Sequence, residues 1–511
     1  MIENIQIKTA LLSVSDKSNL KELAEALTKY GVQLYSTGGT EKFLQDNGYA
    51  IKSVSELTKF PEMMDGRVKT LHPMVHGGLL YRRDVAEHTA QAKEHGIASI
   101  DLLVVNLYPF EATVAKVGST HEEIIENIDI GGPAMLRSAG KNYEGVALLT
   151  APSQYQQFID ELKKSNGSIS KETRLILASE AFEHVAQYDR AIADYFGGAK
   201  KTTLRYGENP HQNATVSGAA LDKLYHQMWG KELSYNNYLD SSASLLLISE
   251  FLDSKKTVVG IIKHTNPCGI AEGKDVLDAF ERAFETDTES PFGGIIVMNR
   301  ECSEALAIRV NEFFSEVILA PSYHEKALEI LKKKKDRRLL TYGVAELKKQ
   351  IAKGKDIRSI VGGILEQESD NQLFANPDMG SVTKRAVTED EREGLLFAWK
   401  ICKHVKSNAI VYARTDNGFA RTLGIGCGQT SRVASSRIAS SNAKRFGHSL
   451  EGSLVASDAF FPFADGLLEA ADAGAIAVIE PGGSMRDAEV IQAAEERNIS
   501  LMMTGMRHFK H

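Results

Sequence analysis

The first 148 residues alternate short, apolar, β-branched segments with segments of helical period. Strands are predicted at residues 9–14, 32–35, 102–105 and 146–149, with helices over 17–30 and from residue 41. Strands that are separated by helices pair in parallel, and helices cover both faces of their sheet. The pattern therefore predicts a doubly wound α/β domain over residues 1–149.

The next segment, residues 150–199, is predicted to be a helical linker. Its pattern is helical apart from a break near Asn166-Gly167, and the glycine-rich stretch at 197–201 favours a domain boundary. Residues 200–511 are again mixed α/β and are too long for one simple core.

A short internal echo divides this second part of the chain. The pattern Asp-x-x-x-Pro-Phe occurs at 287–292 and at 458–463, each time downstream of an apolar strand with a Lys and an Asn. The residues concerned are Lys263 and Asn266, and Lys406 and Asn408. Two related subdomains, 200–375 and 376–511, would explain the echo, although a match this short also arises by coincidence.

The bulk composition is that of a soluble globular protein. Of 511 residues, 43% are hydrophobic and 25% charged, and the net charge of −7 gives no electrostatic reason to expect nucleic acid as a partner. The four cysteines are far apart, which argues against a disulfide framework or a cysteine zinc site. No apolar run reaches the ~18 residues of a membrane span, and no secretory signal is apparent. We expect a cytoplasmic enzyme or binding protein.

A polar run follows the predicted strand at 257–262. This strand ends in Lys263-His264-Thr265-Asn266, after which Pro267-Cys268-Gly269 is predicted to turn the chain. Ligand sites of α/β proteins form outside the carboxyl ends of such strands, and a Lys beside a His there can supply a proton donor and a base. Alternatively, His264 is a hydrogen-bonded strand-end histidine and Lys263 extends its ammonium into water.

Two loops of the N-terminal domain are suited to bind a phosphate. Each places hydroxyl groups between a predicted strand and a helix, and the second adds two glycines that let backbone N–H groups approach an anion. The loops contain Ser13, Ser15 and Lys17, and Ser36, Thr37, Gly38, Gly39 and Thr40. Because Ser and Thr also cap helices without binding a ligand, the prediction rests on the occurrence of both loops in one domain.

Three further segments add polar residues to this domain. The run 65–73 contains Arg67, Lys69 and Thr70, the strand at 102–105 is followed by Asn106 and Tyr108, and the segment 129–142 contains Asp129 and Lys141. Together with the two loops, these residues predict a binding site for a phosphorylated metabolite.

Taken together, these motifs resemble the bifunctional AICAR transformylase/IMP cyclohydrolase family over essentially the whole chain. The N-terminal loops are similar to the cyclohydrolase half, and the transformylase half is represented by 205–212, 263–269, 291–294, 426–432 and 504–511. The resemblance implies a methylglyoxal-synthase-like domain followed by two cytidine-deaminase-like α/β subdomains. It implies no catalytic zinc, because Pro267-Cys268 lacks the second cysteine of a deaminase and no upstream H-x-E is apparent.

The implied first reaction transfers a formyl group from 10-formyltetrahydrofolate to the 5-amino group of AICAR. A base must take the proton of the amine, and the tetrahedral oxyanion needs a cation or donor nearby. By resemblance, His264 is the base, Lys263 is the acid or oxyanion partner, and Asn266 and Asn408 align the reacting groups. The family also implies nucleotide contacts from Arg205, Tyr206 and Arg507, a folate contact from Asp465, and pocket residues Phe292, Gly293, Glu316, Gln429 and Arg432.

The implied second reaction closes the ring of formyl-AICAR to IMP, with loss of water. By resemblance, Asp129 accepts the proton of the carboxamide nitrogen, Lys141 and backbone N–H groups stabilise the oxyanion, and Tyr108 with Lys69 assists loss of water. The substrate is held by Ser13, Ser15, Lys17, residues 36–40, Arg67, Thr70 and Asn106. The family implies no tightly bound cofactor, reduced folate as co-substrate, and a homodimer whose transformylase sites are shared between chains.

Small departures and two other functions have to be weighed against this resemblance. Cys427 and Thr430 stand where the family pattern has Ala and Met, which affects only fine binding geometry. A nucleotide-sensing regulatory protein without turnover would leave Lys69 and Asp129 without a chemical role. A lyase that acts on a triose phosphate would leave residues 200–511 unexplained.

Overall fold

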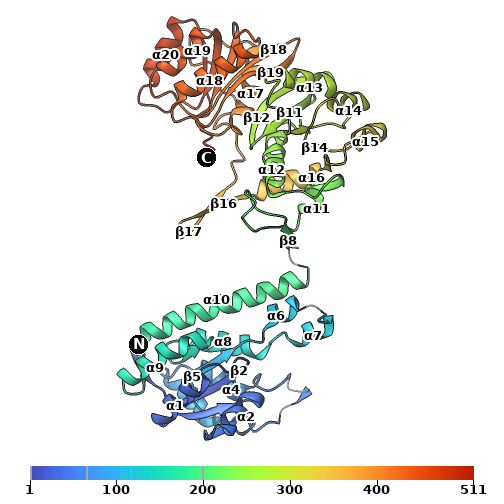
Figure 1. Cartoon of the computed structure of the whole chain (residues 1–511). Coiled ribbons are helices and arrows are strands. Elements are labelled where there is room, and N and C mark those ends of the chain that lie inside the picture. Colours follow the sequence, from blue (N-terminus) through green and yellow to red (C-terminus); the bar gives the residue numbers. More distant parts are fainter. Residues whose placement is uncertain (1–2, 62, 65–66, 117, 198–200) are drawn as a thin grey trace. The chain divides into compact units, whose positions relative to one another are not determined.

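The computed structural model describes residues 3–61, 63–64, 67–116, 118–197 and 201–511. The chain forms two compact units, residues 1–199 and 200–511. The predicted boundary at 197–201 coincides with this division, but residues 198–200 of it lie outside the described residues, as do Asp65 and Gly66 of the run 65–73. The two units are described separately (Figure 1).

The first unit is built on a five-stranded parallel sheet with the order β4-β3-β2-β5-β6. Its strands are β2 (Thr9–Val14), β3 (Gln33–Ser36), β4 (Ile51–Ser53), β5 (Leu102–Asn106) and β6 (Ala147–Leu149). From β2 the chain adds strands first on one side and then, starting with β5, on the other. The predicted doubly wound domain is therefore confirmed, and its switch point lies between β2 and β5.

Ten α-helices of the described chain belong to this unit. They are α1 (Leu20–Lys29), α2 (Gly38–Asp46), α3 (Val54–Thr58), α4 (Pro73–Leu80), α5 (Ala86–Glu94), α6 (Phe110–Ala115), α7 (His121–Glu126), α8 (Gly131–Lys141), α9 (Tyr155–Lys164) and α10 (Lys171–Tyr195). The structure thus follows the alternation that the sequence predicts.

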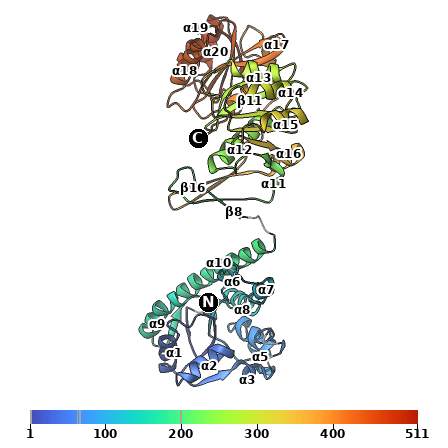
Figure 2. The same cartoon turned by 45° about the vertical axis from the view of Figure 1, so that its right-hand side comes forward.

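The segment 150–199 is an integral part of the first unit. Its strand β7 (Ser168–Ser170) pairs with β1 (Asn4–Gln6), and α10 packs along α8, as both cartoon views show (Figures 1 and 2). Phe158, Leu177 and Val185 are buried in the same hydrophobic core as the central strands. The segment is helical as predicted, but its apolar positions bury it against the domain instead of leaving it as a free-standing linker.

The second unit is built on an eleven-stranded mixed sheet with the order β10-β15-β14-β13-β11-β12-β19-β18-β20-β21-β22. The strands of its first half are β10 (His226–Trp229), β11 (Thr257–Lys263), β12 (Asn266–Gly273), β13 (Ile295–Met298), β14 (Val317–Ala320) and β15 (Arg338–Thr341). Those of its second half are β18 (Ile410–Asp416), β19 (Phe419–Gly426), β20 (Ser453–Ser457), β21 (Ala475–Glu480) and β22 (Ser500–Met503).

The two halves share one topology. Each has a leading helix, an antiparallel hairpin, a helix, and then three parallel strands joined by helices. The helices are α12 (Tyr235–Ser249), α13 (Val276–Phe284), α14 (Glu304–Val310) and α15 (Glu325–Leu331) in the first half, and α17 (Glu389–Cys402), α18 (Arg432–Arg445), α19 (Asp465–Asp472) and α20 (Asp487–Glu496) in the second. Two related halves are therefore present.

The short sequence echo does not mark equivalent places in these halves. Residues 287–292 precede β13, whereas residues 458–463 follow β20, the strand that corresponds to β13. Likewise, Lys406 and Asn408 precede β18 instead of lying on a strand. The inference of a repeat was correct, but the motif match that suggested it is a coincidence.

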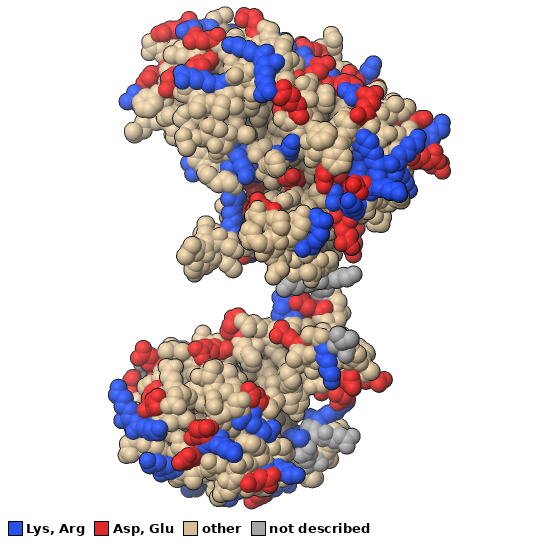
Figure 3. Space-filling model, viewed as in Figure 1, with Lys and Arg blue, Asp and Glu red and all other residues tan. Residues whose placement is uncertain are grey.

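The remaining elements of the second unit lie at its edges. They are the hairpins β8–β9 (Lys201–Leu204, Ala214–Ser217) and β16–β17 (Lys355–Ile360, Gly363–Glu368), and helices α11 (Leu221–Leu224) and α16 (Val344–Lys353). Within the described ranges, no helix is both long and apolar enough to cross a membrane. On the face in Figure 3, basic and acidic side chains are interspersed.

Glycines set the distance between each central hairpin and its covering helix. Gly269 and Gly273 lie on β12 beneath α13, and Gly424 and Gly426 lie on β19 beneath α18. A Cβ at Gly426 would overlap the backbone carbonyl oxygen of Ser435 in α18. Close helix–sheet packing at the centre of the unit therefore requires residues without a side chain.

We expect Gly426→Ala to destabilise the second unit by about 2–3 kcal/mol, because the added methyl group forces the backbone of α18 outward. Thermal unfolding of the full-length protein would report this as a lower midpoint. Gly380→Ala is the matched control, because a Cβ at Gly380 meets nothing within 4 Å. Equal midpoints for the two variants would contradict the packing argument.

Candidate active sites

A cavity of about 600 Å³ opens at the carboxyl ends of the strands in the first unit. It lies at the switch point of the sheet, where loops from both sides of the strand order meet. The predicted residues that line it are Ser13, Ser15, Lys17, Thr37, Gly38, Gly39, Thr40, Arg67, Lys69, Thr70, Asn106, Tyr108 and Asp129. The structure thus brings most of the residues predicted for this domain into one place.

Hydrogen bonds between the loops fix the floor of the cavity. The Thr40 hydroxyl accepts from the N–H of Val14 (3.1 Å) and donates to its carbonyl (2.9 Å), and the Ser13 and Thr37 hydroxyls are 3.0 Å apart. The side-chain oxygen of Asn106 accepts from the N–H (2.6 Å) and the hydroxyl (3.0 Å) of Ser15. The loops after β2, β3 and β5 are thereby held as one surface.

The N-terminus of α2 gives this surface a preference for anions. The helix begins at Gly38, with Thr37 as its N-cap, so its unpaired N–H groups and positive dipole end face the cavity. Gly38 has a φ of +42°, and the Lys69 ammonium lies 3.4 Å from the position that a Cβ of Gly38 would occupy. A phosphate would therefore meet both backbone donors and a cation at this point.

Asp129 lies opposite, in the loop before α8. Its carboxylate accepts from the N–H of Gly132 (2.8 Å), and its own N–H donates to the Tyr188 hydroxyl of α10 (2.8 Å). Burial raises the pKa of Asp129, and hydrogen bonds from the N–H groups of Gly132 and Gly131 oppose that change. A carboxylate with a raised pKa is a better proton acceptor near neutral pH.

Two residues predicted for this site lie elsewhere. Ser36 is buried and donates to the carbonyl of Leu12. Its hydroxyl is therefore part of the hydrogen bonding between β3 and β2 and does not line the cavity. Lys141 is exposed at the last residue of α8, about 15 Å along the helix from its cavity end, and does not line the cavity. The predicted oxyanion role of Lys141 therefore has no geometric support, because the helix carries its side chain away from Asp129.

The second polar centre lies where the two halves of the second unit meet. The strand prediction at 257–262 is confirmed by β11, but the expected turn at Pro267-Cys268-Gly269 is wrong. The chain turns at His264 and Thr265, and β12 already starts at Asn266. Lys263 donates to the backbone carbonyl of Phe292 (3.0 Å), and the side-chain oxygen of Asn266 accepts from the N–H of Lys406 (3.0 Å).

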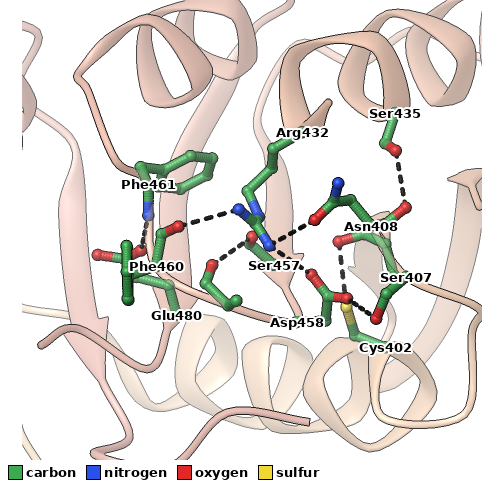
Figure 4. Close-up of polar contacts among 12 residues, drawn as sticks. Cys402, Ser407, Asn408, Arg432, Ser435, Ser457, Asp458, Phe460, Phe461 and Glu480 are labelled. Carbon is green, nitrogen blue, oxygen red and sulfur yellow. Dashed lines mark hydrogen bonds and ion pairs between the residues drawn. The ribbon is translucent and has the colours of Figure 1, made fainter. Parts of the chain in front are cut away.

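Arg432 organises the half of this centre that Figure 4 shows. Its guanidinium donates to the Asn408 side-chain oxygen (2.9 Å), to the carboxylate of buried Asp458 (3.1 Å) and to the carbonyl of Phe460 (3.1 Å). Asp458 also accepts from the Ser407 hydroxyl (2.5 Å), and the Asn408 amide donates to the carbonyl of Gln429 (2.9 Å). Asn408, Gln429 and Arg432 thus form one hydrogen-bonded group.

The remaining predicted residues make other contacts. Arg205 stacks on Tyr206 (4.5 Å), Glu316 pairs with Arg338 (2.5 Å), and Arg507 lies over Phe509 (4.7 Å). Exposed Asp465 accepts from the N–H of Gly466, while Gly293 donates its N–H to the carbonyl of Phe314. Among the described residues, none of these side chains hydrogen-bonds to Lys263 or His264.

Sequence reasoning missed several residues of both centres. In the sequence patterns Asp458 is only the first residue of the second echo motif, although an Asp directly after an apolar strand is a signal for a site. Glu126 lines the cavity and forms an ion pair with Arg67, and no motif pointed to it. Asp240 accepts from the N–H of Thr265 (2.8 Å), a contact that only the folded chain reveals.

Glu480, at the end of β21, is a buried carboxyl beside this second centre. One oxygen accepts from the N–H of Phe461 (2.7 Å), and the other has no hydrogen-bond partner in the described chain (Figure 4). Burial raises the pKa of Glu480 from 4.5 to about 7. The group is therefore protonated in mildly acidic solution and has to ionise within the core as the pH rises.

A raised carboxyl pKa stabilises the fold at low pH, and this stabilisation is lost as pH rises from 4.5 through about 7. Between pH 5 and pH 8 this group should lower the free energy of unfolding of the wild-type protein by about 2.5 kcal/mol, and we expect Glu480→Gln to abolish that decrease. Chemical denaturation at several pH values would measure it. The control is Glu496→Gln on the exposed end of α20, and a wild-type midpoint that is independent of pH would contradict the assignment.

The fold and its two polar centres define a two-site α/β protein whose N-terminal domain is suited to bind an anion. The family model described as "AICARFT/IMPCHase bienzyme" matches residues 139–442, and the model described as "MGS-like domain" matches residues 19–134. The chain therefore belongs to the AICARFT/IMPCHase bienzyme family.

Known relatives are similar over their full length. The bifunctional purine biosynthesis protein PurH of Chlorobium chlorochromatii (strain CaD3) is 51% identical over 528 residues, with 99% of both chains covered. The protein of the same name from Parvibaculum lavamentivorans is 50% identical over 532 residues, with 99% of this chain and 97% of that protein covered. A solved structure titled "Crystal structure of ForH" is 36% identical, with a TM-score of 0.34, and covers 37% of this chain and 97% of that one.

Proposed function

We propose that this protein transfers a formyl group from 10-formyltetrahydrofolate to AICAR and then closes formyl-AICAR to IMP. The observation that carries the proposal is its full-length similarity to bifunctional PurH proteins, together with two separate polar centres in two units. Ring closure is assigned to residues 1–149, with 150–199 packed on that domain, and formyl transfer to the halves 200–375 and 376–511. 10-Formyltetrahydrofolate acts as a co-substrate, and no tightly bound cofactor is required.

Ring closure takes place in the cavity of the first unit. The phosphate is held at the N-terminus of α2, and the carboxamide nitrogen attacks the formyl carbon while its proton moves to Asp129. Lys69, next to the anion-binding end of α2, stabilises the oxyanion in the role first predicted for Lys141. Asp129 then passes the proton that it accepted to the oxyanion, which becomes a hydroxyl. Tyr108 protonates this hydroxyl as it leaves as water, and the former formamide nitrogen gives its proton to the Tyr108 oxygen as the C=N bond forms. Because both reacting groups belong to one molecule, correct orientation supplies much of the acceleration.

Formyl transfer takes place at the turn between β11 and β12. The amine of AICAR attacks the formyl carbon while His264 takes its proton, and Lys263 stabilises the oxyanion before it protonates the departing folate nitrogen. Lys263 is restrained by its hydrogen bond to the carbonyl of Phe292. Asn408, held by Arg432, positions the substrate from the other half.

We predict that the two activities can be lost separately. His264→Ala should lower formyl transfer by about 10²–10⁴-fold, the usual contribution of a general base, and leave closure of supplied formyl-AICAR unchanged. Asp129→Ala should have the reverse effect. Both activities can be followed by absorbance with AICAR and 10-formyltetrahydrofolate, or with formyl-AICAR alone.

The controls for this experiment are His226→Ala and Asp253→Ala, two changes at exposed side chains that lie outside both centres. Loss of both activities from either folded active-site variant would refute the two-site assignment. Absence of IMP with the wild-type protein would refute the proposed function as a whole.

We further propose a cytoplasmic homodimer. All four cysteines are free thiols, as suits a reducing compartment. The hairpin β16–β17 exposes apolar side chains, with Val361 and Ile364 at 106% and 69% of full exposure, and such a surface marks an interaction site. Within the described part of the chain, Arg205 and Tyr206 form no hydrogen bond with the turn at His264 and Thr265, which supports sites that are completed by a second copy.

We expect Ile364→Lys to weaken the dimer, because a charge would be buried in its interface, and to lower formyl transfer while ring closure persists. Analytical ultracentrifugation would measure the change in mass. Ile308→Lys, at a residue that is 54% exposed on α14, is the matched control. A wild-type protein that sediments as a monomer at micromolar concentration would contradict the dimer.

A further inference from the structure

The turn that presents His264 has a backbone conformation that its residues disfavour. His264 and Thr265 have φ values of +51° and +63°, and Lys263 pairs with Asn266 on either side of them. Two-residue hairpin turns with two positive φ values are normally formed by Gly, Asn or Asp. A His followed by a β-branched Thr is strained there, and such strain persists only where the surroundings hold the backbone.

Asp240, from α12, is the side chain that holds this turn from outside the hairpin. Its carboxylate accepts from the N–H of Thr265 at 2.8 Å, while within the hairpin the Asn266 amide donates to the carbonyl of His264 at 3.1 Å. Helix α12 is itself fixed, because a capping box at Ser234 secures its start and it packs against β11 and β13. The turn is therefore tied to a rigid element.

Asp240 also places a negative charge beside the imidazole. It is half-buried, so burial raises its pKa, whereas hydrogen bonding to Thr265 and the positive charges of His264 and Lys406 lower it. Further charged or titratable groups of the described residues in this region are Lys263 on the hairpin, and Asp287, Cys268 and Cys427 nearby. The negative charge of Asp240 is thus opposite in sign to the charges of Lys263 and Lys406 around this turn.

We propose that Asp240 is a positioning residue for His264: it holds the strained turn and stabilises the imidazolium that forms during formyl transfer. The inference rests on the proposed role of His264 as base. The proton moves from the amine of AICAR to the imidazole, and Asp240 remains a carboxylate throughout. Neither the sequence motifs nor the predicted site included this residue.

The decisive variant is Asp240→Asn in the full-length protein. An Asn side chain keeps an oxygen that can accept from the N–H of Thr265, but it removes the charge. We expect the pKa of His264, measured by NMR with labelled histidine and assigned by comparison with His264→Gln, to fall by about one. The acidic limb of the kcat/KM profile for formyl transfer should move to lower pH by the same amount, with kcat reduced about tenfold.

Three comparisons separate this role from a merely structural one. Asp240→Glu, which keeps the charge, should restore most of the wild-type pKa of His264, and Asp253→Asn, at an exposed aspartate of the same unit, should change nothing. Asp240→Ala should lower both the stability and the pKa. An unchanged His264 pKa and pH profile in folded Asp240→Asn would overturn the proposal.

If His264 is not the base, the experiments would give a result different from the one that overturns the role of Asp240. If His264→Ala retained formyl transfer, the role of His264 and the catalytic part of this inference would both be wrong. The NMR titration of Asp240→Asn would still show whether the carboxylate and the imidazole are coupled, because it does not depend on turnover. The two failures are therefore distinguishable.

Discussion

The contact between β12 and β19 is the constraint on which the second unit depends. Along this contact, Ala271 of β12 and Arg421 of β19 are the one pair of described residues in strand register. Hydrogen bonds from side chains join the two strands elsewhere. The Thr422 hydroxyl accepts from the N–H of Ile270 (3.0 Å) and donates to its carbonyl (3.1 Å), and Glu272 accepts from the N–H of Ala420 (2.9 Å). A buried threonine thus replaces part of a strand ladder.

The direction of this seam explains why the second centre forms. Because β12 and β19 are antiparallel, the start of β12 lies at the same edge as the end of β19 and the start of its partner β18. Lys263 and Asn266 from one half therefore meet Lys406 and Asn408 from the other. The two equivalent hairpins contribute opposite ends, so the repeat yields an asymmetric site in which one half presents the turn with Lys263 and His264 and the other presents the hydrogen bonds of Arg432.

Sequence reasoning succeeded where one rule of geometry decides the outcome. Parallel strands bring their carboxyl ends to one edge, so residues such as Ser15 and Asn106 could be placed together from their positions alone. It failed where that rule was not enough. Pro267-Cys268-Gly269 has turn-like composition, but tertiary contacts hold the turn at His264 instead. Lys141 follows Asp129 in sequence, but a rigid helix separates them, and Asp240 carries no local signal because its partner is distant in sequence.

The packing of residues 150–199 onto the first unit has a consequence for how this protein can be divided. Tyr188 of α10 holds the loop that presents Asp129 and is itself part of the hydrophobic core. A fragment that ends at residue 149 would lose this support and expose the surface that α9 and α10 cover. An independently folding N-terminal domain, whether excised in the laboratory or separated by gene fission, would have to retain the chain through the end of α10.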